Sequence, residues 1–228
     1  MLTINDLTVN YDTHTVLRNL HWDLEAGCVH GLVGLNGAGK TTLLNTMYGL
    51  TKKSKGEILY HNSPLRREKI SFLQTENYFY SMITGREYLN FFLYYNPHYK
   101  LASLLDFFHL PLDELVDTYS TGMRKKLAIL ASLILDKEIV IFDEPFNGID
   151  IESVFVVSKL IGQLRGKQKI IIITSHILDS LTPLCDKIHW LKDGEINKSF
   201  ERTEFSLLKS SLEENLQEKY SSMNDILL

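Results

Sequence analysis

The chain of 228 residues is long enough for one large domain, or two small lobes, with a substantial hydrophobic core. Hydrophobic residues make up 44% and charged residues 23%, the balance of an ordinary globular protein. The formal net charge of −4 at pH 7 disfavours nucleic acid and anionic membrane surfaces as main partners.

Cysteine usage and the N-terminal region indicate the compartment. Cys28 and Cys185 lie far apart in sequence, which disfavours a structural disulfide and favours a reducing cytosolic environment. The first twenty residues contain Asp6 and Asp12 and no apolar segment, so we expect no signal peptide. No apolar run approaches the ~18 residues that a membrane-spanning helix needs. If the protein works at a membrane, another chain must therefore cross it.

Residues 1–27 alternate apolar and polar side chains over short stretches interrupted by asparagine, aspartate and glycine. This period of two predicts a set of short antiparallel strands. Tyr11 follows the first strands and precedes a glycine-rich loop. Taken alone, its ring is better explained as a packed aromatic than as a ligand contact.

The glycine-rich loop follows an apolar strand predicted at 29–33 and precedes a helical pattern. Strand, loop and helix in this order are the context in which G-x-x-x-x-G-K-[ST] binds phosphate. Loop N–H groups converge on an anion, and the helix N-terminus adds its positive end. Lys40 can reach the β- and γ-phosphates, and the Thr41 hydroxyl is placed to hold Mg²⁺. A loop that serves only a tight turn is the alternative; the flanking elements favour a nucleotide site, whose residues are Gly34, Leu35, Asn36, Gly37, Ala38, Gly39, Lys40, Thr41 and Thr42.

Strand-like segments follow at 57–60 and 70–73, and the second ends at Gln74. Ligand sites gather at the carboxyl ends of strands in open α/β sheets, so the position of this amide is suggestive. On its own, however, an ordinary loop glutamine is the simpler explanation.

Residues 75–135 change to a helical pattern, which a capping box at 84–87 opens. Pro97 and Pro111 divide it into short helices, so we expect a helical insertion between two strands of the nucleotide-binding sheet. Aromatic residues are dense from 78 to 99. They form either a small helical core or a surface for a partner protein, since exposed aromatics concentrate at interfaces.

A polar turn at 119–123 precedes a helix predicted over about 123–135. Ser120 or Thr121 is a suitable N-cap. A serine and a glycine at a helix start form a second anion site in principle, although such caps occur on most helices.

An apolar run at 139–142 ends in two acids, Asp143 and Glu144. In P-loop enzymes such an aspartate holds Mg²⁺ opposite the glycine loop. The next carboxylate can polarise a water against the γ-phosphate. The alternative is an acidic turn at a helix start, but the glycine loop upstream favours the catalytic interpretation.

The last third of the chain completes the pattern of strands and helices. A turn at 146–150 precedes a helix that ends at 166, and the β-branched run at 170–174 predicts a strand buried on both faces. His176 follows that strand and, alone, is most simply a loop residue. Residues 188–196 predict a hairpin turned at Asp-Gly. Residues 201–228 are polar with weak helical periodicity, and we expect a tail without a site.

In their order and spacing, these features resemble the nucleotide-binding subunit of ATP-binding cassette (ABC) transporters over residues 1–200. The resemblance rests on seven ordered features: residues 34–42 as Walker A, 139–144 as Walker B with its catalytic glutamate, Gln74 as the Q-loop, 119–123 as the signature, 147–150 as the D-loop, His176 as the switch histidine and Tyr11 as the aromatic on adenine.

The resemblance implies an α/β fold: a P-loop nucleotide-binding core with an antiparallel β subdomain and an inserted α-helical subdomain. It implies one ABC ATPase domain, with the core at 1–74 and 136–200, the helical subdomain at 75–135 and the tail at 201–228. The implied activity is ATP hydrolysis, with ATP and Mg²⁺ as cofactors.

The resemblance also implies a mechanism in which two such domains sandwich two ATP molecules, each between one glycine loop and the signature of the other subunit. The implied roles are catalysis by Lys40, Glu144 and His176; Mg²⁺ binding by Thr41, Gln74 and Asp143; contact with ATP in trans by Ser120, Thr121 and Gly122; and the D-loop at Asn147 and Asp150.

The partners implied by the resemblance are an integral membrane permease subunit, which would contact residues 75–135, and a second nucleotide-binding subunit, identical or different. No nucleic acid is expected. The protein would then sit at the cytoplasmic face of the cell membrane, held there by the membrane subunit.

The signature departs from the family's usual Leu-Ser-Gly-Gly-Gln: this chain has Tyr119-Ser120-Thr121-Gly122-Met123, followed by three basic residues. Exporter-type members, including multidrug and antibiotic-resistance subunits, often carry a Tyr-Ser-x-Gly-Met form, so the resemblance favours an exporter. Two alternatives are a soluble ABC ATPase of translation or DNA repair and a P-loop kinase of a small metabolite. The first usually has two cassettes or a long coiled coil, and the second would not need the signature, the D-loop or the switch histidine.

Overall fold

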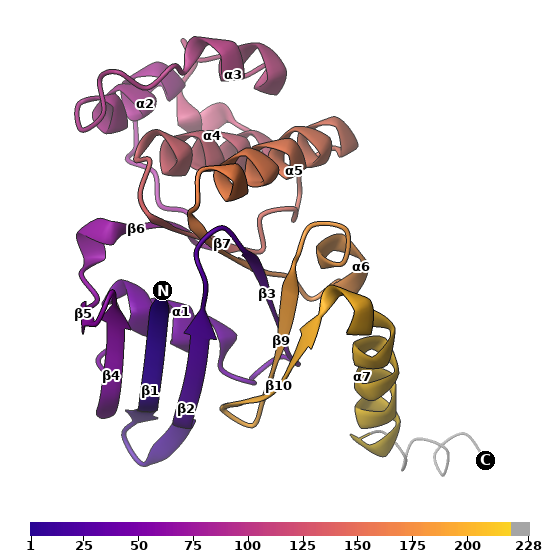
Figure 1. Cartoon of the computed structure of the whole chain (residues 1–228). Coiled ribbons are helices and arrows are strands. Elements are labelled where there is room, and N and C mark those ends of the chain that lie inside the picture. Colours follow the sequence, from indigo (N-terminus) through magenta and orange to yellow (C-terminus); the bar gives the residue numbers. More distant parts are fainter. Residues whose placement is uncertain (220–228) are drawn as a thin grey trace.

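A six-stranded sheet forms the centre of the computed structural model, which describes residues 1–219. Neighbouring strands run parallel except for β10, which pairs antiparallel with β9 through the hairpin predicted at Asp193-Gly194. Figure 1 shows this sheet between a helical layer and a second sheet. The strands, in spatial order, are β10 (Glu195–Glu201), β9 (Lys187–Lys192), β3 (Val29–Val33), β8 (Ile170–Thr174), β7 (Ile139–Asp143) and β6 (Ile70–Leu73).

The second sheet is the antiparallel set predicted from the N-terminal alternation. Its strand order is β2-β1-β4-β5, so the N-terminal hairpin pairs with a strand that follows the first helix. The bounds are β1 (Leu2–Tyr11), β2 (His14–Leu24), β4 (Lys55–Tyr60) and β5 (Ser63–Pro64).

Alternate side chains of the central strands fill two different cores, because successive residues of a strand face opposite sides of a sheet. Ile139 and Ile141 pack with Leu43 of α1 (Lys40–Tyr48) and with the antiparallel sheet. Val140 and Phe142 pack on the other face, among the helices. Burial on both faces explains why these strands read as unbroken apolar runs.

Helices cover the second face of the central sheet and build an upper layer above it (Figure 1). The helical insertion lies between β6 and β7, as predicted, and begins with a capping box between Thr84 and Glu87. No helix within residues 1–219 is long and apolar enough to cross a membrane. The helices are α2 (Gly85–Leu93), α3 (Ala102–Phe108), α4 (Thr121–Ile134), α5 (Ile151–Gly166), α6 (Leu178–Leu181) and α7 (Phe205–Lys219), with 3₁₀ turns at Arg67–Lys69, Val116–Thr118 and Arg202–Glu204.

The helical insertion has no core of its own. One continuous cluster of buried residues contains Leu89 of α2, Phe108 of α3, Leu127 of α4 and Phe142 of β7. The insertion is therefore packed directly onto the sheet that carries the predicted nucleotide site.

The segment predicted as a polar tail is structured over much of its length. Strand β10 extends to Glu201, and α7 packs onto the protein through Phe205 and Leu208, which are both buried. Polar side chains dominate the rest of this helix, and so few apolar positions produce only a weak periodicity in the sequence. Residues 220–228 lie outside the described residues.

Candidate functional site

The glycine loop joins β3 to α1 and leaves the start of that helix open. Gly37 and Gly39 have φ values of 84° and 106°, a region that glycine enters without steric cost. Gly39 is also the N-cap of α1, and no side chain caps this helix. The N–H groups of its first turn can therefore donate hydrogen bonds to an anionic ligand.

Lys40 folds back over its own loop. Its ammonium donates to the Gly34 carbonyl at 2.6 Å and to the Leu35 carbonyl at 3.4 Å. Burial lowers the pKa of Lys40, and the carboxylates of Asp143 and Glu144 act in the opposite direction. A phosphate at the loop would offer this cation stronger, charged acceptors than the two carbonyls.

Asp143 is the last residue of β7, and two hydroxyls fix its carboxylate. Thr174 donates to one oxygen at 2.5 Å and Thr75 donates to the other at 2.8 Å. The aspartate side chain is buried, yet it borders the space beside the loop. Its orientation is thus set by the ends of the two strands that flank β7.

Glu144 follows in an unusual backbone conformation, with φ of 51°. A non-glycine residue in this left-handed region costs on the order of 1–3 kcal/mol, and the surroundings must enforce it. Here the Glu144 N–H donates to the Thr174 hydroxyl at 3.0 Å. The carboxylate lies 3.0 Å from Nδ1 of His176. Since an ionised carboxylate only accepts, the imidazole must donate from Nδ1.

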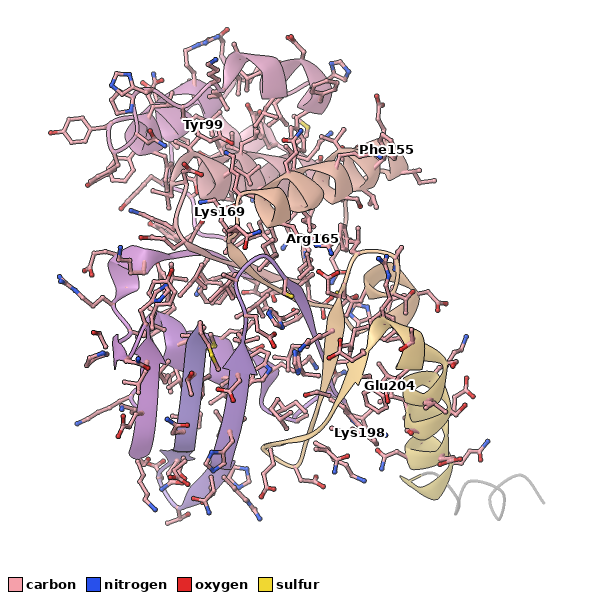
Figure 2. The ribbon with its side chains drawn as sticks, in the orientation of Figure 1. Tyr99, Phe155, Arg165, Lys169, Lys198 and Glu204 are labelled. Carbon is pink, nitrogen blue, oxygen red and sulfur yellow. The ribbon has the colours of Figure 1, made fainter. Side chains whose placement is uncertain are left out.

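One cavity of about 400 Å³ brings the loop and the acids together, although they are more than a hundred residues apart in the sequence. Figure 2 shows the side chains of the molecule as sticks in the orientation of Figure 1. The cavity is lined by Val16, Asn36, Gly37, Ala38, Gly39, Lys40, Thr41, Thr42, Thr75, Asp143 and Glu144.

An adjoining cavity of about 360 Å³ is lined by several residues whose side chains carry oxygen atoms. Hydroxyl, amide and carboxylate oxygens are the ligands that Mg²⁺ prefers, and it usually keeps several of its waters. The buried Oδ1 of Asn45, a residue that lines this cavity, has no hydrogen-bond partner among the described residues. The residues therefore fit a magnesium ion; the lining is Thr41, Asn45, Phe72, Gln74, Thr75, Glu76 and Asp143.

Sequence reasoning missed the cavity-lining residues Asn45, Phe72 and Glu76 and four others of this site. Thr75 and Thr174 hold Asp143, and Val16 lines the cavity from the antiparallel sheet. Lys125 of α4 donates to the carbonyls of Gln74 and Thr75 at 3.3 and 3.0 Å, and burial lowers its pKa. Only Thr75 and Thr174, which lie at or near the carboxyl ends of core strands, carried a signal that could have identified them.

The predicted signature residues lie at the start of α4 and are not among the residues that line the cavity. Ser120 is the N-cap, and its hydroxyl accepts from the Met123 N–H at 3.2 Å. A Cβ at Gly122 would lie 2.5 Å from the Gly148 carbonyl oxygen, so glycine permits this close contact with the D-loop segment. Ser120 and Thr121 are both exposed.

The predicted D-loop connects Glu144 to α5. The Asn147 N–H lies 3.4 Å from the Glu144 carbonyl, which closes the turn. Asp150 caps α5 by accepting from the Ser153 N–H at 2.8 Å, and it pairs with Lys126 of α4 at 3.1 Å. Hydrogen bonds from Ser153, followed by that from Lys126, hold the pKa of Asp150 well below its ordinary value.

Tyr11 lies at the end of β1 and is about half exposed. Its hydroxyl forms a hydrogen bond with Thr51 at 3.3 Å, and it is not among the residues that line the cavity. Stacking of its ring on adenine stays a prediction.

Several known proteins are similar to this chain in sequence. A family model described as "ABC transporter" matches residues 17–147. The ABC transporter ATP-binding protein NatA of Bacillus subtilis (strain 168) is 32% identical over 215 residues, which cover 86% of this chain and 87% of the relative. The putative ABC transporter ATP-binding protein AlbC of the same organism is 30% identical, covering 87% and 90%.

Solved structures share the fold. The structure of an ATP-binding subunit of an ABC transporter superposes with a TM-score of 0.84 at 25% identity and covers 91% of this chain and 94% of that one. A dimeric bacterial ABC transporter cassette superposes with a TM-score of 0.76 at 19% identity and covers 89% and 99%. The predicted α/β architecture is thereby confirmed.

Proposed function

The chain belongs to the family of ABC transporter ATP-binding proteins, and we propose that it is the ATP-hydrolysing subunit of an exporter. That it binds and hydrolyses ATP for an ABC transporter follows from the family. The direction of transport and the roles of individual residues are the proposal. The observation that supports the roles is the single cavity shared by the glycine loop, Asp143 and Glu144.

ATP binding would use the open start of α1. The N–H groups of the loop and the ammonium of Lys40 would hold the β- and γ-phosphates, as the loop geometry permits. Thr41, Gln74 and Asp143 would hold Mg²⁺, which when bound neutralises charge that develops on the phosphates.

Glu144 would orient the attacking water or remove its proton. Its backbone N–H is held by Thr174, and the residue lines the same cavity as the glycine loop, which supports this role. His176 holds that carboxylate from the solvent side, and the same imidazole would contact the γ-phosphate of bound ATP. Loss of that phosphate would return the histidine to Glu144, which couples hydrolysis to a local rearrangement.

A second nucleotide-binding subunit would complete each site. Ser120 and Thr121 are exposed at a helix start that borders no nucleotide cavity of its own chain, which supports a role toward ATP held by another subunit. This chain contains both halves of such a composite site, so a symmetric dimer is chemically sufficient.

The aromatics of the helical insertion support a contact with a membrane subunit. The two sequence interpretations each describe part of them: Tyr88 and Phe92 pack against the core, while another group is exposed. An exposed aromatic group of this size is typical of a protein interface. Its members are Tyr78, Tyr80, Phe91, Tyr94 and Tyr95, each more than half exposed. Binding there would place the protein at the cytoplasmic face of the membrane.

The exporter assignment rests on the signature. Tyr119 is buried, its hydroxyl donates to the Pro111 carbonyl at 2.7 Å, and it packs against Gly85 at the start of α2. The tyrosine that replaces the leucine of the usual signature thus makes specific packing and hydrogen-bond contacts within the helical insertion. In inside-out vesicles that also contain the membrane subunit, an exporter would accumulate its substrate when ATP is added outside. Release of preloaded substrate under the same conditions would instead identify an importer.

The Glu144→Gln variant tests the catalytic assignment. Removing the base should lower turnover by about 10²–10⁴-fold. The amide keeps the size of the side chain, so ATP binding should persist and an ATP-bound dimer should accumulate. Phosphate release and gel filtration with ATP measure the two effects, with Glu213→Gln on α7 as a control that keeps full activity. Hydrolysis by Glu144→Gln at the unaltered rate would show that another group is the base.

A further inference from the structure

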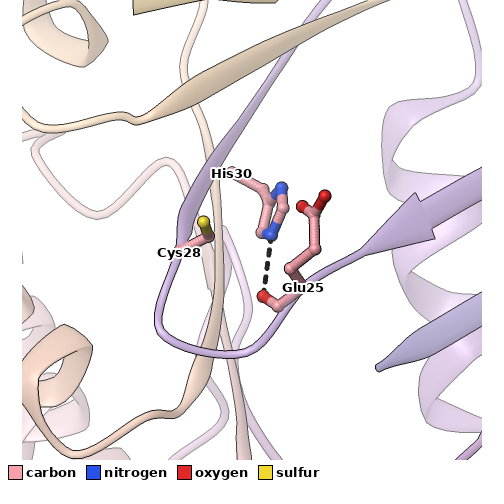
Figure 3. Close-up of side chains that lie close together, drawn as sticks. All are labelled: Glu25, Cys28 and His30. Carbon is pink, nitrogen blue, oxygen red and sulfur yellow. Dashed lines mark hydrogen bonds between the residues drawn. The ribbon is translucent and has the colours of Figure 1, made fainter.

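A second cluster of chemically active side chains lies at the amino end of β3, opposite to the end that carries the glycine loop. Glu25 and Cys28 come from the loop between β2 and β3, and His30 is the second residue of β3. One carboxylate oxygen, the thiol sulfur and one ring nitrogen lie within 4.8 Å of one another. Figure 3 shows the imidazole between the thiol and the carboxylate. None of these residues takes part in the nucleotide site.

His30 is held at both ring nitrogens. Nε2 lies 3.1 Å from the Glu25 carbonyl oxygen and Nδ1 lies 3.1 Å from Nε2 of His189. His189 Nδ1 in turn lies 2.7 Å from the Ser199 hydroxyl. Burial lowers the pKa of His30 and brings that of His189 to about 3, so both rings are neutral near pH 7.

The direction of every proton in this chain of hydrogen bonds follows from its carbonyl end. A carbonyl oxygen only accepts, so His30 donates from Nε2 and its Nδ1 is an acceptor. His189 must then donate from Nε2, and its Nδ1 accepts from the Ser199 hydroxyl. The chain runs from Ser199 through both imidazoles to the loop that carries Glu25.

We propose that Cys28 Sγ, the Glu25 carboxylate and His30 Nε2 form a binding site for one divalent zinc-type cation, with the fourth position open to water. A thiolate, an imidazole and a carboxylate are the donors that zinc takes in proteins. Bonds of about 2.0–2.3 Å put the ligand atoms of a tetrahedral site about 3.3–3.8 Å apart. Closing a 4.8 Å cluster to that spacing requires rotation of the two loop side chains and displacement of the Glu25 carbonyl, which lies 3.1 Å from Nε2.

The hydrogen-bond chain can reverse when the cation takes Nε2. His30 then donates from Nδ1 to His189 Nε2, and His189 donates from Nδ1 to the Ser199 oxygen. Both histidine contacts survive, and only the Glu25 carbonyl loses its donor. A ligating histidine whose other N–H is held in this way is the usual arrangement at protein metal sites.

The carboxylates near Cys28 disfavour its thiolate form in the absence of a cation, but they favour the binding of a cation to that thiolate. Burial raises the pKa of the Cys28 thiol, and the carboxylates of Asp186 and Glu25 raise it further. The same carboxylates attract a divalent cation, whereas Lys187 and Arg165, which act on the thiol pKa in the opposite direction, repel it. Binding of the cation releases the thiol proton to solvent. Lys187 pairs with one oxygen of Glu25 at 2.8 Å, which leaves the other oxygen for the metal.

The site is independent of ATP binding in this proposal. Along β3, His30 lies four residues, or about 13 Å, from Gly34 of the glycine loop. A bound cation would tie the loop between β2 and β3 to the central sheet. It would therefore stabilise the folded protein without being required for hydrolysis.

Cobalt substitution tests the proposal on the full-length chain. Co²⁺ added to chelator-treated protein should produce a sulfur-to-cobalt charge-transfer band and saturate at one ion per chain, and Zn²⁺ should displace it. The band should disappear in Cys28→Ser and remain in Cys185→Ser, since the buried Cys185 is not part of the cluster. Glu25→Gln, which keeps the thiol, should weaken Co²⁺ binding by at least about 10-fold.

The spectroscopic readout separates this site from the oxygen-lined magnesium cavity, which cannot give a thiolate band. Absence of the band in the unaltered protein, or its persistence in Cys28→Ser, would overturn the proposal. Unchanged Co²⁺ affinity in Glu25→Gln would remove the carboxylate from the ligand set and overturn it as stated. Circular dichroism of each variant shows that the fold is intact.

Discussion

Two helix starts in this molecule carry the same ingredients but are used differently. Helices α1 and α4 both begin beside glycine and hydroxyl residues, and both point positive ends outward. The start of α1 has no side-chain cap and lines a cavity. The start of α4 is capped by Ser120 of its own chain and borders no such cavity.

The difference shows what makes a helix start a binding site. At α1, Gly37 and Gly39 have positive φ values and shape the loop around the cavity, and no side chain accepts from the N–H groups of the first helical turn. At α4, the Ser120 hydroxyl already accepts from Met123, and Gly122 is pressed against Gly148. The first is a ligand site in one chain, whereas the second needs a surface from outside.

The largest expected effect is on ATP hydrolysis by a mixed dimer, which tests whether the two helix starts act on the same ATP. Ser120→Arg and Lys40→Ala should each abolish hydrolysis as homodimers, because each destroys a different half of the site. Random pairing of equal amounts should restore activity on the order of a quarter of the unaltered level, since half the dimers keep one intact composite site. A coupled phosphate-release assay measures the recovery. If the mixture stays inactive while co-purification proves that mixed dimers form, the two helix starts do not act on one shared ATP.

Gly122→Ala should give the next largest effect, by disturbing the contact between α4 and the D-loop. The new methyl would lie 2.5 Å from the Gly148 oxygen, so the backbone must shift. Overpacking of this kind costs about 1–3 kcal/mol. Urea unfolding measures the loss, and hydrolysis should fall with it.

The matched control for this substitution is Gly162→Ala in α5. A methyl there would meet nothing within 4 Å, and alanine is the better helix former. It should raise stability by about 0.5–1 kcal/mol. Equal losses in the two variants would contradict the close contact at Gly122.

Ser120→Ala should lower stability less than Gly122→Ala. It removes the N-cap of α4, which typically costs about 1 kcal/mol. Ser120→Asp restores a cap and should recover that stability, yet it places a carboxylate where we expect a γ-phosphate to approach and should reduce hydrolysis. Thermal unfolding and ATPase assays on the two variants separate the roles. A fully active Ser120→Asp protein would argue against contact between Ser120 and ATP.

Sequence predicted the elements most completely where one local signal defined them. The apolar runs at 139–142 and 170–174 became buried strands, and Thr84 with Glu87 formed the predicted capping box. The polar segment after residue 200 was misjudged, because α7 packs through only a few apolar side chains. A weak periodic pattern does not reveal a helix that buries little surface.

The site residues were likewise predictable only where a local sequence signal defined them. The glycine loop and the two acids are recognisable because their residue types and flanking elements are contiguous in the sequence. Lys125 was not, since it lies between Arg124 and Lys126 in a basic run at the start of α4, and only the fold shows that it reaches Gln74 and Thr75. Residues that position others through long-range contacts leave no local pattern.

Sequence by itself determined that this chain binds a nucleotide triphosphate, and it supplied the order of motifs that marks an ABC ATPase. Only the tertiary structure decided that Thr174 fixes both Asp143 and Glu144, and that His176 meets the glutamate. It alone placed Ser120 away from the glycine loop of its own chain and joined His30 to His189. The physical reason is that each motif consists of residues that are neighbours in the sequence. Distances between motifs, by contrast, depend on how the strands pair and the helices pack.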